Sequence, residues 1–361
     1  MSDLSFRLPA EYEPQAAVWL TWPGNTATWK HCREGLETAY AEFAALITRF
    51  QPVEMICCAA WQPGAMRRLN AAKADLSRIT LHDWPSNDAW CRDHGPLFVK
   101  AADGTPAIVD LRYNAWGGKF PPWDDDDAVP KRVADLRGLP CHRVPVFGEG
   151  GAIEINRQGV MITTESVWLN PNRNPGLTKA GAEALFRQYL GATEVVWLPG
   201  GMAADDTDGH IDTLSRFVND STVVSVLPDE SDPDYPVLRD NYDRLSERFE
   251  AVPLPHPRTI IPDGWDEEVL PATYANFLIL NEAVLIPAYR QAGRDEDALH
   301  LLHELFPDRE VLPVDCSDIL WEGGALHCLS MQEPLWFRGF QAGDRTTHDP
   351  HVNPFPRHRA D

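Results

Sequence analysis

Several acids surround one histidine at positions 205–213. Asp205 and Asp206 precede His210 in this stretch, and Asp212 follows it. If 210–217 forms a strand, His210 and Asp212 project from the same face, where they can share proton transfer and the binding of a cation. Two alternatives remain open: a capped turn, and a metal site built from the histidine and the acids at 205, 208 and 212.

A short pattern occurs twice and is followed the second time by a cysteine. Glu149-Gly-Gly-Ala-Ile matches Glu322-Gly-Gly-Ala-Leu, and the latter runs directly into His327 and Cys328. Such an echo predicts equivalent strand entries in a pseudo-symmetric fold, with glycines where backbones crowd together. If 326–330 is a strand, neighbouring side chains point to opposite faces, so the cysteine would need another histidine as partner. A lone cysteine in an apolar strand is otherwise a buried structural thiol.

Polar and aromatic residues are dense at 84–96, directly before a Gly-Pro turn. The segment includes Trp90 and Asp93, and its density exceeds what a surface loop needs. The alternative is a structural turn in which Arg92 pairs with an aspartate. The segment at 84–96 and the two stretches described above together supply a thiol, an imidazole and several carboxylates. A thiolate can attack an electrophilic carbon, and paired carboxylates can bind a planar guanidinium.

Composition excludes several other classes of function. The chain of 361 residues carries 54 acidic and 32 basic residues, a net charge of -22, so it should repel nucleic acid and anionic membranes and tolerate a cationic substrate. No run approaches about 20 apolar residues, and no secretory signal is visible. The seven cysteines lack CxxC spacing, which predicts a reducing cytoplasm and no disulfide framework. No G-x-S-x-G, P-loop or dinucleotide motif is present.

The periodicity of apolar residues predicts one α/β domain over 1–361, because short strands alternate with helices and no linker is visible. The acidic run at 124–127 should be a solvated loop or a helix start. Helices are expected at 33–50, 179–190, 234–250 and 295–306. Strands are expected at 53–58, 96–100, 107–111, 152–155, 160–163, 194–197, 222–226, 277–280, 283–286 and 326–330.

Seven ordered motifs make the chain resemble the agmatine deiminase family, in the peptidyl-arginine deiminase-like branch of the guanidino-group modifying enzymes. They are Leu8-Pro-Ala-Glu-Tyr-Glu-Pro with Trp19-Leu-Thr-Trp-Pro, Asn87-Asp-Ala-Trp-Cys-Arg-Asp-His-Gly-Pro, Tyr113-Asn-Ala-Trp-Gly-Gly-Lys, Glu149-Gly-Gly-Ala-Ile-Glu, Leu169-Asn-Pro-Asn-Arg-Asn-Pro, Asp206-Thr-Asp-Gly-His-Ile-Asp and Gly323-Gly-Ala-Leu-His-Cys.

The resemblance implies a five-bladed, pseudo-symmetric α/β propeller of ββαβ modules around a central active site. It also implies a cytoplasmic homodimer that hydrolyses agmatine to N-carbamoylputrescine and ammonia without metal or cofactor. The implied roles are a nucleophile at Cys328, a general acid/base at His210, an orienting acid at Glu149 and guanidinium-binding aspartates at Asp93 and Asp212. Substrate-binding roles fall on Asp205, Asp206, Trp90 and Trp116.

The resemblance leaves open which chemical group the substrate carries at the end opposite its guanidinium. The family usually reads Gly-Gly-Gly-Asn-Ile-His-Cys where this chain has Gly-Gly-Ala-Leu-His-Cys, and it commonly has Glu where this chain has Asp206. Free or peptidyl arginine is therefore the alternative substrate, and its carboxylate would need a cationic partner such as Arg173. The extra acids at 205 and 206 favour an amine tail instead.

Overall fold

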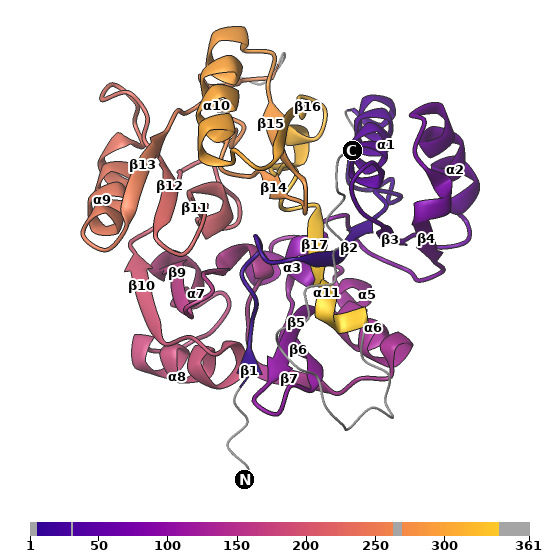
Figure 1. The fold of residues 1–361 in the computed structure, drawn as a ribbon, viewed down its shortest axis with the longest axis horizontal. Helices are drawn as coiled ribbons and strands as arrows, with labels where there is room; N and C mark the ends of the chain where they lie inside the picture. Colours follow the sequence, from indigo (N-terminus) through magenta and orange to yellow (C-terminus); the bar gives the residue numbers. More distant parts are fainter. Residues whose placement is uncertain (1–5, 30–31, 263–268, 339–361) are drawn as a thin grey trace, which may run out of the picture.

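The structure is a computed structural model that describes residues 6–29, 32–262 and 269–338. Its strands form five small sheets arranged in a ring, with helices on the outside (Figure 1). In each sheet a middle strand pairs antiparallel with one neighbour and parallel with another. A parallel pair needs a crossover, and each of these crossovers contains at least one helix. The predicted five-bladed α/β propeller of ββαβ modules is confirmed.

Four modules follow one another along the chain. The first is β5 (Leu97–Ala101), β6 (Pro106–Arg112), α6 (Val129–Arg137) and β7 (Cys141–Phe147). The second is β8 (Glu154–Ile155), β9 (Val160–Thr164), α8 (Lys179–Leu190) and β10 (Glu194–Leu198). The third is β11 (Ser215–Phe217), β12 (Thr222–Val226), α9 (Tyr235–Ser246) and β13 (Glu250–Leu254). The fourth is β14 (Leu278–Ile279), β15 (Ala283–Ala288), α10 (Ala292–Leu305) and β16 (Glu310–Asp315).

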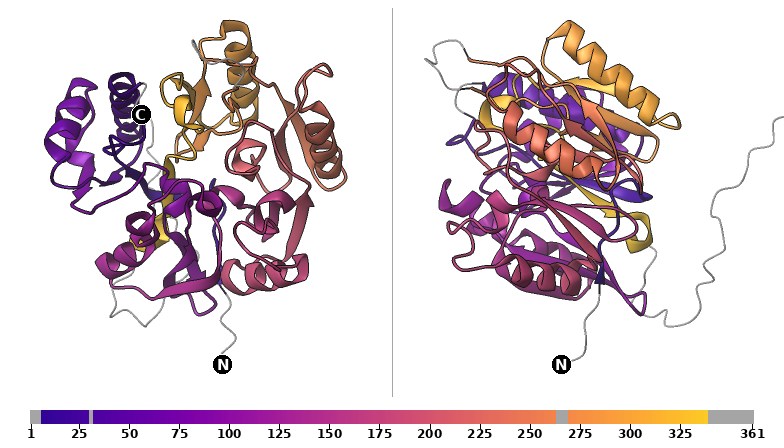
Figure 2. Two further views of the ribbon diagram at one scale, coloured as in Figure 1. Left: turned by 180° about the vertical axis from the view of Figure 1, so that it is seen from behind. Right: turned by 90° about the vertical axis from the view of Figure 1, so that its left-hand side faces the viewer.

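The fifth module joins the two ends of the chain. Its first strand, β17 (Ser330–Pro334), comes from the C-terminal part and pairs antiparallel with β2 (Gln15–Thr21). Helix α1 (Arg33–Thr48) then leads to β3 (Val53–Ile56). Figure 2 shows β17 in yellow beside the indigo start of the chain. The ring is thus closed by hydrogen bonds between its ends.

Short elements complete the described fold around these modules. β1 (Phe6–Arg7) extends the first sheet and β4 (Ile79–His82) extends the fifth. The short helices are α2 (Gln62–Ala71), α3 (Cys91–His94), α4 (Ala115–Gly118), α5 (Asp124–Asp127), α7 (Glu165–Trp168) and α11 (Leu335–Arg338). No helix among the described residues is long and apolar enough to cross a membrane.

Burial along the strands explains their order from the centre outward. The middle strands β2, β9 and β12 are buried at every residue, as expected for strands covered on both faces. The last strands, such as β10 and β13, begin with exposed residues and lie at the rim. The first strand of each module lies on the side of its sheet that faces the centre of the ring (Figure 1). The residues that directly precede this strand therefore also lie near the centre.

Most predicted strands and helices are present, but the strand predicted at 326–330 is wrong over its first four residues. The structure also does not meet the condition that 210–217 forms one strand. Residues 326–329 form a turn before β17, and residues 211–213 form a 3-10 turn before the short β11. The acidic run forms helix α5, but Asp126 is buried because its carboxylate accepts from the backbone N–H groups of Asn87 and Asp88. Strands β2, β7, β13 and β16 and helix α2 were not predicted.

Candidate active site at the centre of the ring

The segments that enter the first strand of each module meet at one buried point. Asp93 lies in α3 before β5, Glu149 precedes β8, His210 and Asp212 precede β11, and Cys328 precedes β17. All five side chains are buried. The structure therefore brings together the five residues to which the resemblance assigned catalytic roles. Asn276, which precedes β14, completes the set from the fourth module.

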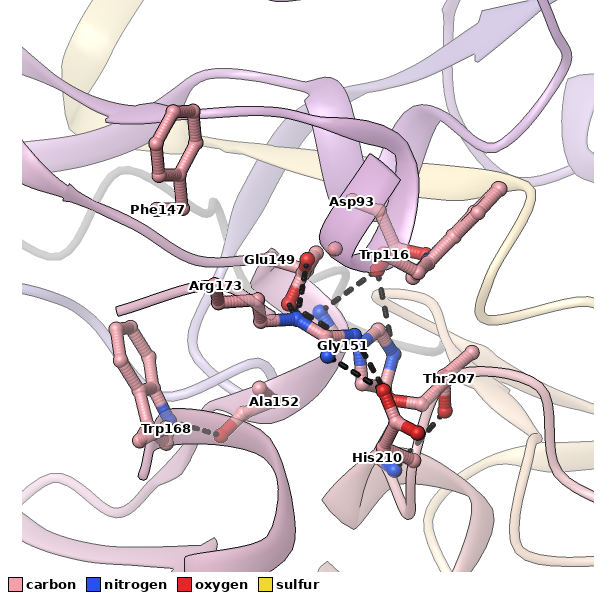
Figure 3. Close-up of polar contacts among 12 residues, drawn as sticks. Asp93, Trp116, Phe147, Glu149, Gly151, Ala152, Trp168, Arg173, Thr207 and His210 are labelled. Carbon is pink, nitrogen blue, oxygen red and sulfur yellow. Dashed lines mark hydrogen bonds and ion pairs between the residues drawn. The ribbon is translucent and has the colours of Figure 1, made fainter. Parts of the chain in front are cut away.

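His210 lies between two carboxylates, as Figure 3 shows. Its Nδ1 is 3.5 Å from Asp93 Oδ1, and its Nε2 is 3.5 Å from Glu149 Oε2. Burial alone would lower the pKa of His210, but the two carboxylates and Asp212 raise it to about 9. The imidazole is consequently a cation at neutral pH that can donate a proton.

Glu149 is held by Arg173 as well as by the histidine. The Nε of Arg173 donates to both carboxylate oxygens, at 2.8 and 3.0 Å, and its Nη1 lies 2.6 Å from Asp208 Oδ2. Burial would raise the pKa of Glu149, but Arg173 and His210 hold it below its ordinary value. The sequence made Arg173 a possible partner for a carboxylate tail. Its side chain is fully buried against these acids, so it does not serve that purpose.

Asp93 is oriented by two donors. The backbone N–H of Gly151 donates to its Oδ1 and the indole Nε1 of Trp116 to its Oδ2, both at 3.0 Å. Burial raises the pKa of Asp93 to about 6, although the charge of His210 opposes this rise. Asp93 is mostly ionised at neutral pH and becomes neutral on mild acidification.

The Sγ atom of Cys328 contacts an amide and a carboxylate. Asn276 Nδ2 donates to its Sγ at 3.1 Å, and Asp212 Oδ2 is 3.7 Å away. Burial, together with the charges of Asp212 and Asp93, raises the pKa of this thiol well above its ordinary value. The thiol is therefore protonated until a cation arrives beside it.

The turn at 325–329 corrects our expectation for His327. Backbone bonds from Leu329 to Ala325 and from Ser330 to His327 curl the chain, so the two neighbouring side chains do not diverge as on a strand. His327 Nδ1 lies 2.7 Å from the same Asp212 oxygen that Cys328 approaches. Similarly, a 3-10 turn rather than a strand carries Asp212 after His210.

A cavity of about 50 Å³ lies over Cys328. Trp90, Trp116 and Asp206, to which the resemblance gives substrate-binding roles, line this cavity. Asp88 and Glu322, which the sequence analysis did not assign, line it too. Its complete lining is Thr28, Asp88, Trp90, Asp93, Trp116, Phe120, Asp206, Thr207, Glu322, Gly323, Gly324 and Cys328. Burial raises the pKa of Asp88 to about 6. A cavity of about 660 Å³ adjoins it and shares Phe120, Asp206, Glu322 and Gly323.

Trp116 is presented to this cavity by a left-handed turn. Ala115 has φ 48° and Trp116 has φ 56°, which L side chains rarely adopt. The Asn114 side chain stabilises the turn by accepting from the Gly117 N–H at 2.9 Å. Such strain is typical of functional sites, because only the surrounding structure can maintain it.

Asp205 does not line the cavity. Its Oδ1 accepts from the N–H and hydroxyl of Thr207, and its Oδ2 accepts from Thr213. We therefore assign Asp205 to shaping the loop before His210. Within residues 6–29, 32–262 and 269–338, no three His, Cys, Asp or Glu side chains are grouped as metal ligands. Asp208, a member of the alternative metal set, is paired with Lys119 and Arg173.

The second glycine of each copy of the repeated pattern lies against a side chain of the site. A Cβ on Gly151 would lie 2.5 Å from His210 Nδ1 and 2.7 Å from Asp93 Oδ1. A Cβ on Gly324 would lie 2.3 Å from the Trp90 ring. The echo thus marks two places where backbone and site side chains are in direct contact, which only glycine permits.

The chain is similar to several known proteins along most of its length. The model of the Porphyromonas-type peptidyl-arginine deiminase family matches residues 7–334. The agmatine deiminase of Pseudomonas syringae pv. tomato is 34% identical over 361 residues, covering 92% of this chain and 96% of that protein. The solved agmatine deiminase of Enterococcus faecalis has a TM-score of 0.84 at 30% identity, over 91% of this chain and 96% of that one. A substrate-bound Cys-to-Ser agmatine deiminase of C. jejuni has a TM-score of 0.84 at 28% identity, over 92% and 97%.

We predict that Gly151→Ala disables the site. The new methyl group must displace His210 or Asp93, and a displacement of about 1 Å can cost about 100-fold in rate. Steady-state kinetics with agmatine, the substrate that the resemblance implies, would measure the loss. Gly293→Ala in α10 is the control, because nothing lies within 4 Å of the added methyl group. The activity of this variant should therefore equal that of the unaltered protein. Equal activity of both variants would contradict the assigned centre.

Proposed function

The chain belongs to the Porphyromonas-type peptidyl-arginine deiminase family, and from this premise we propose that it hydrolyses agmatine to N-carbamoylputrescine and ammonia. One observation carries the proposal: a buried thiol lies at a cavity lined by several acids, beside two aspartates and a cationic histidine. A guanidinium is planar, cationic and rich in N–H donors, so it matches paired carboxylates in charge and in hydrogen bonding.

Asp93 and Asp212 bind the guanidinium in this proposal and preserve its positive charge. That charge makes the central carbon electrophilic. It also offsets the two carboxylates that keep the Cys328 thiol protonated, so binding of the substrate favours the thiolate at the moment it is needed. Asn276 Nδ2, already 3.1 Å from Sγ, stabilises the developing thiolate.

The reaction then proceeds in two steps. Cys328 Sγ forms a bond to the guanidinium carbon, His210 protonates the departing amino group, and ammonia leaves a covalent thiouronium. Neutral His210 next takes one proton from water as the water oxygen bonds to the carbon. The C–S bond then breaks, and the second proton of that water returns to the Cys328 thiolate. The thiol proton released at the start leaves with ammonia as ammonium. Guanidinium and water thus give a ureido group and ammonium, and both side chains return to their starting states.

The lining of the cavity supports agmatine over arginine. Asp88, Asp206 and Glu322 suit an amine at the far end of the substrate, and none of the lining residues is Lys or Arg. Arg258 lines only the larger adjoining cavity. The family's name keeps peptidyl arginine as the second candidate substrate.

We also propose that the protein is located in the cytoplasm, because all seven cysteines are free thiols. The homodimer implied by the resemblance stays a prediction.

We predict that Cys328→Ala lowers turnover of agmatine by at least about 1,000-fold, because no other group can form the covalent bond. Calorimetry should show agmatine affinity within several-fold of the original protein, since both aspartates remain. Cys316→Ala is the matched control: it removes another fully buried thiol and should leave turnover nearly unchanged. Turnover by Cys328→Ala near the original rate would overturn the proposal.

We predict a bell-shaped dependence of kcat/KM on pH. Activity falls below about pH 6 because Asp93 becomes neutral and loses the guanidinium, and it falls above about pH 9 because His210 loses the proton it donates. Trp116→Phe removes an N–H that stabilises the Asp93 carboxylate, so the acid limb should move to higher pH. The basic limb should stay in place. An unmoved acid limb would contradict this role of Trp116.

We predict that Asp206→Asn raises the KM for agmatine about tenfold, the magnitude of a lost charge-assisted contact. Butylguanidine, which lacks the second amine, should be affected much less. Assays with agmatine, arginine and a blocked arginine peptide at equal concentration complete the test, and agmatine should be preferred. Equal losses for agmatine and butylguanidine would show that Asp206 acts on the loop before His210. A preference for the peptide would favour the second candidate function.

A further inference from the structure

His327 joins two buried carboxylates directly behind the nucleophile. Its Nδ1 lies 2.7 Å from Asp212 Oδ2, and its Nε2 lies 2.7 Å from Glu11 Oε2. The imidazole is only 1% exposed. Each ring nitrogen can bond an ionised carboxylate only by donating a hydrogen, so this arrangement requires an imidazole that carries a hydrogen on both nitrogens.

Glu11 is in turn fixed by two other parts of the ring. It comes from the N-terminal motif Leu8-Pro-Ala-Glu, which the catalytic chemistry does not use. Its Oε1 accepts from the Ile279 N–H at 2.8 Å, and its Oε2 also pairs with the buried Arg216. Burial would raise the pKa of Glu11, but Arg216 and His327 hold it well below its ordinary value. Glu11 is therefore a fixed anion against which His327 is held.

The contact with His327 distinguishes the two substrate-binding aspartates. Burial raises the pKa of Asp93. Burial would also raise the pKa of Asp212, but the hydrogen bond and charge of His327 and the charge of His210 keep it below its ordinary value. The other charged or titratable groups that act on Asp212 are Arg216, Arg92, Asp93, Asp205 and Cys328. His327 also fixes the rotation of the carboxylate, because it binds Oδ2. Oδ1 is buried and has no hydrogen-bond partner among the described residues.

We propose that His327, held by Glu11, is a positioning residue that keeps Asp212 ionised and turned so that Oδ1 can receive the guanidinium. This inference rests on the proposed deimination. Without His327, two buried carboxylates would share the site with one fewer cation, and Asp212 would take up a proton more readily. It would then lose affinity for the substrate and also its fixed orientation.

Two amide variants separate the two contacts of the imidazole. In His327→Asn, the amide nitrogen can replace Nδ1 and still donate to Asp212, but it does not reach Glu11. In His327→Gln, the longer side chain can replace Nε2 and reach Glu11, while the donor to Asp212 is lost. The two variants thus differ in the contact that the proposal requires, and both remove the charge.

We predict that His327→Gln lowers kcat/KM for agmatine about 100-fold and moves its acid limb up by about one pH unit or more. His327→Asn should retain at least tenfold more activity than His327→Gln, with a smaller movement of the limb. Circular dichroism and thermal melting would identify a variant that fails to fold. A purely structural role for His327 predicts equal losses in both variants and an unmoved acid limb, and that result would overturn the proposal.

Agmatine affinity in the Cys328→Ala background provides a readout independent of turnover. Calorimetry across pH should show that adding His327→Gln moves the loss of binding to higher pH, whereas adding His327→Asn moves it less. Identical pH dependence in all three proteins would overturn the positioning role and leave the deiminase proposal standing. Absence of agmatine binding and turnover in the unaltered protein would instead overturn the proposed function.

Discussion

Carboxylates gathered out of water at one point impose the main constraint on this protein. Asp93, Glu149 and Asp212 are all buried at the centre of the ring. A buried charge costs several kcal/mol unless other groups compensate it. Arg173 compensates Glu149, and His327 compensates Asp212. His210 lies between Asp93 and Glu149. The centre of the ring therefore pairs its buried carboxylates with cationic side chains that come from other segments.

The ring architecture makes this arrangement possible, since the charged groups come from different modules. The entry segments of the modules converge, while their later strands and helices lie toward the rim. No single segment has to place several like charges beside one another. Closure by β17 and β2 also shapes the site, because it brings His327 and Cys328 from one end of the chain together with Glu11 from the other.

Close packing and local strain give the site its geometry. Gly151 allows its backbone to donate to Asp93 where any Cβ would collide with His210, and Gly324 allows Trp90 to pack over the cavity. The left-handed turn at Trp116 directs an indole N–H to Asp93. These contacts fix the position of the Asp93 carboxylate. A carboxylate that is already in position can stabilise charge that develops during a reaction without first having to reorient.

Residue types and local periodicity by themselves determine much of this protein. Helix 179–190 has the predicted bounds, because its apolar stripe and its Thr cap are local signals. The ordered motifs identify Cys328, His210, Glu149, Asp93 and Asp212, and the echo of Glu-Gly-Gly-Ala predicts a repeated strand entry. Only the tertiary structure decides the partners of these residues. Asn276 carries no motif, Arg173 could have faced a substrate, and a strand would have turned His327 away from its neighbour. Their roles depend on contacts between segments far apart in the chain, such as the 116 residues that separate Asp212 from Cys328. Local propensity does not encode such contacts, because they arise only when the whole ring closes.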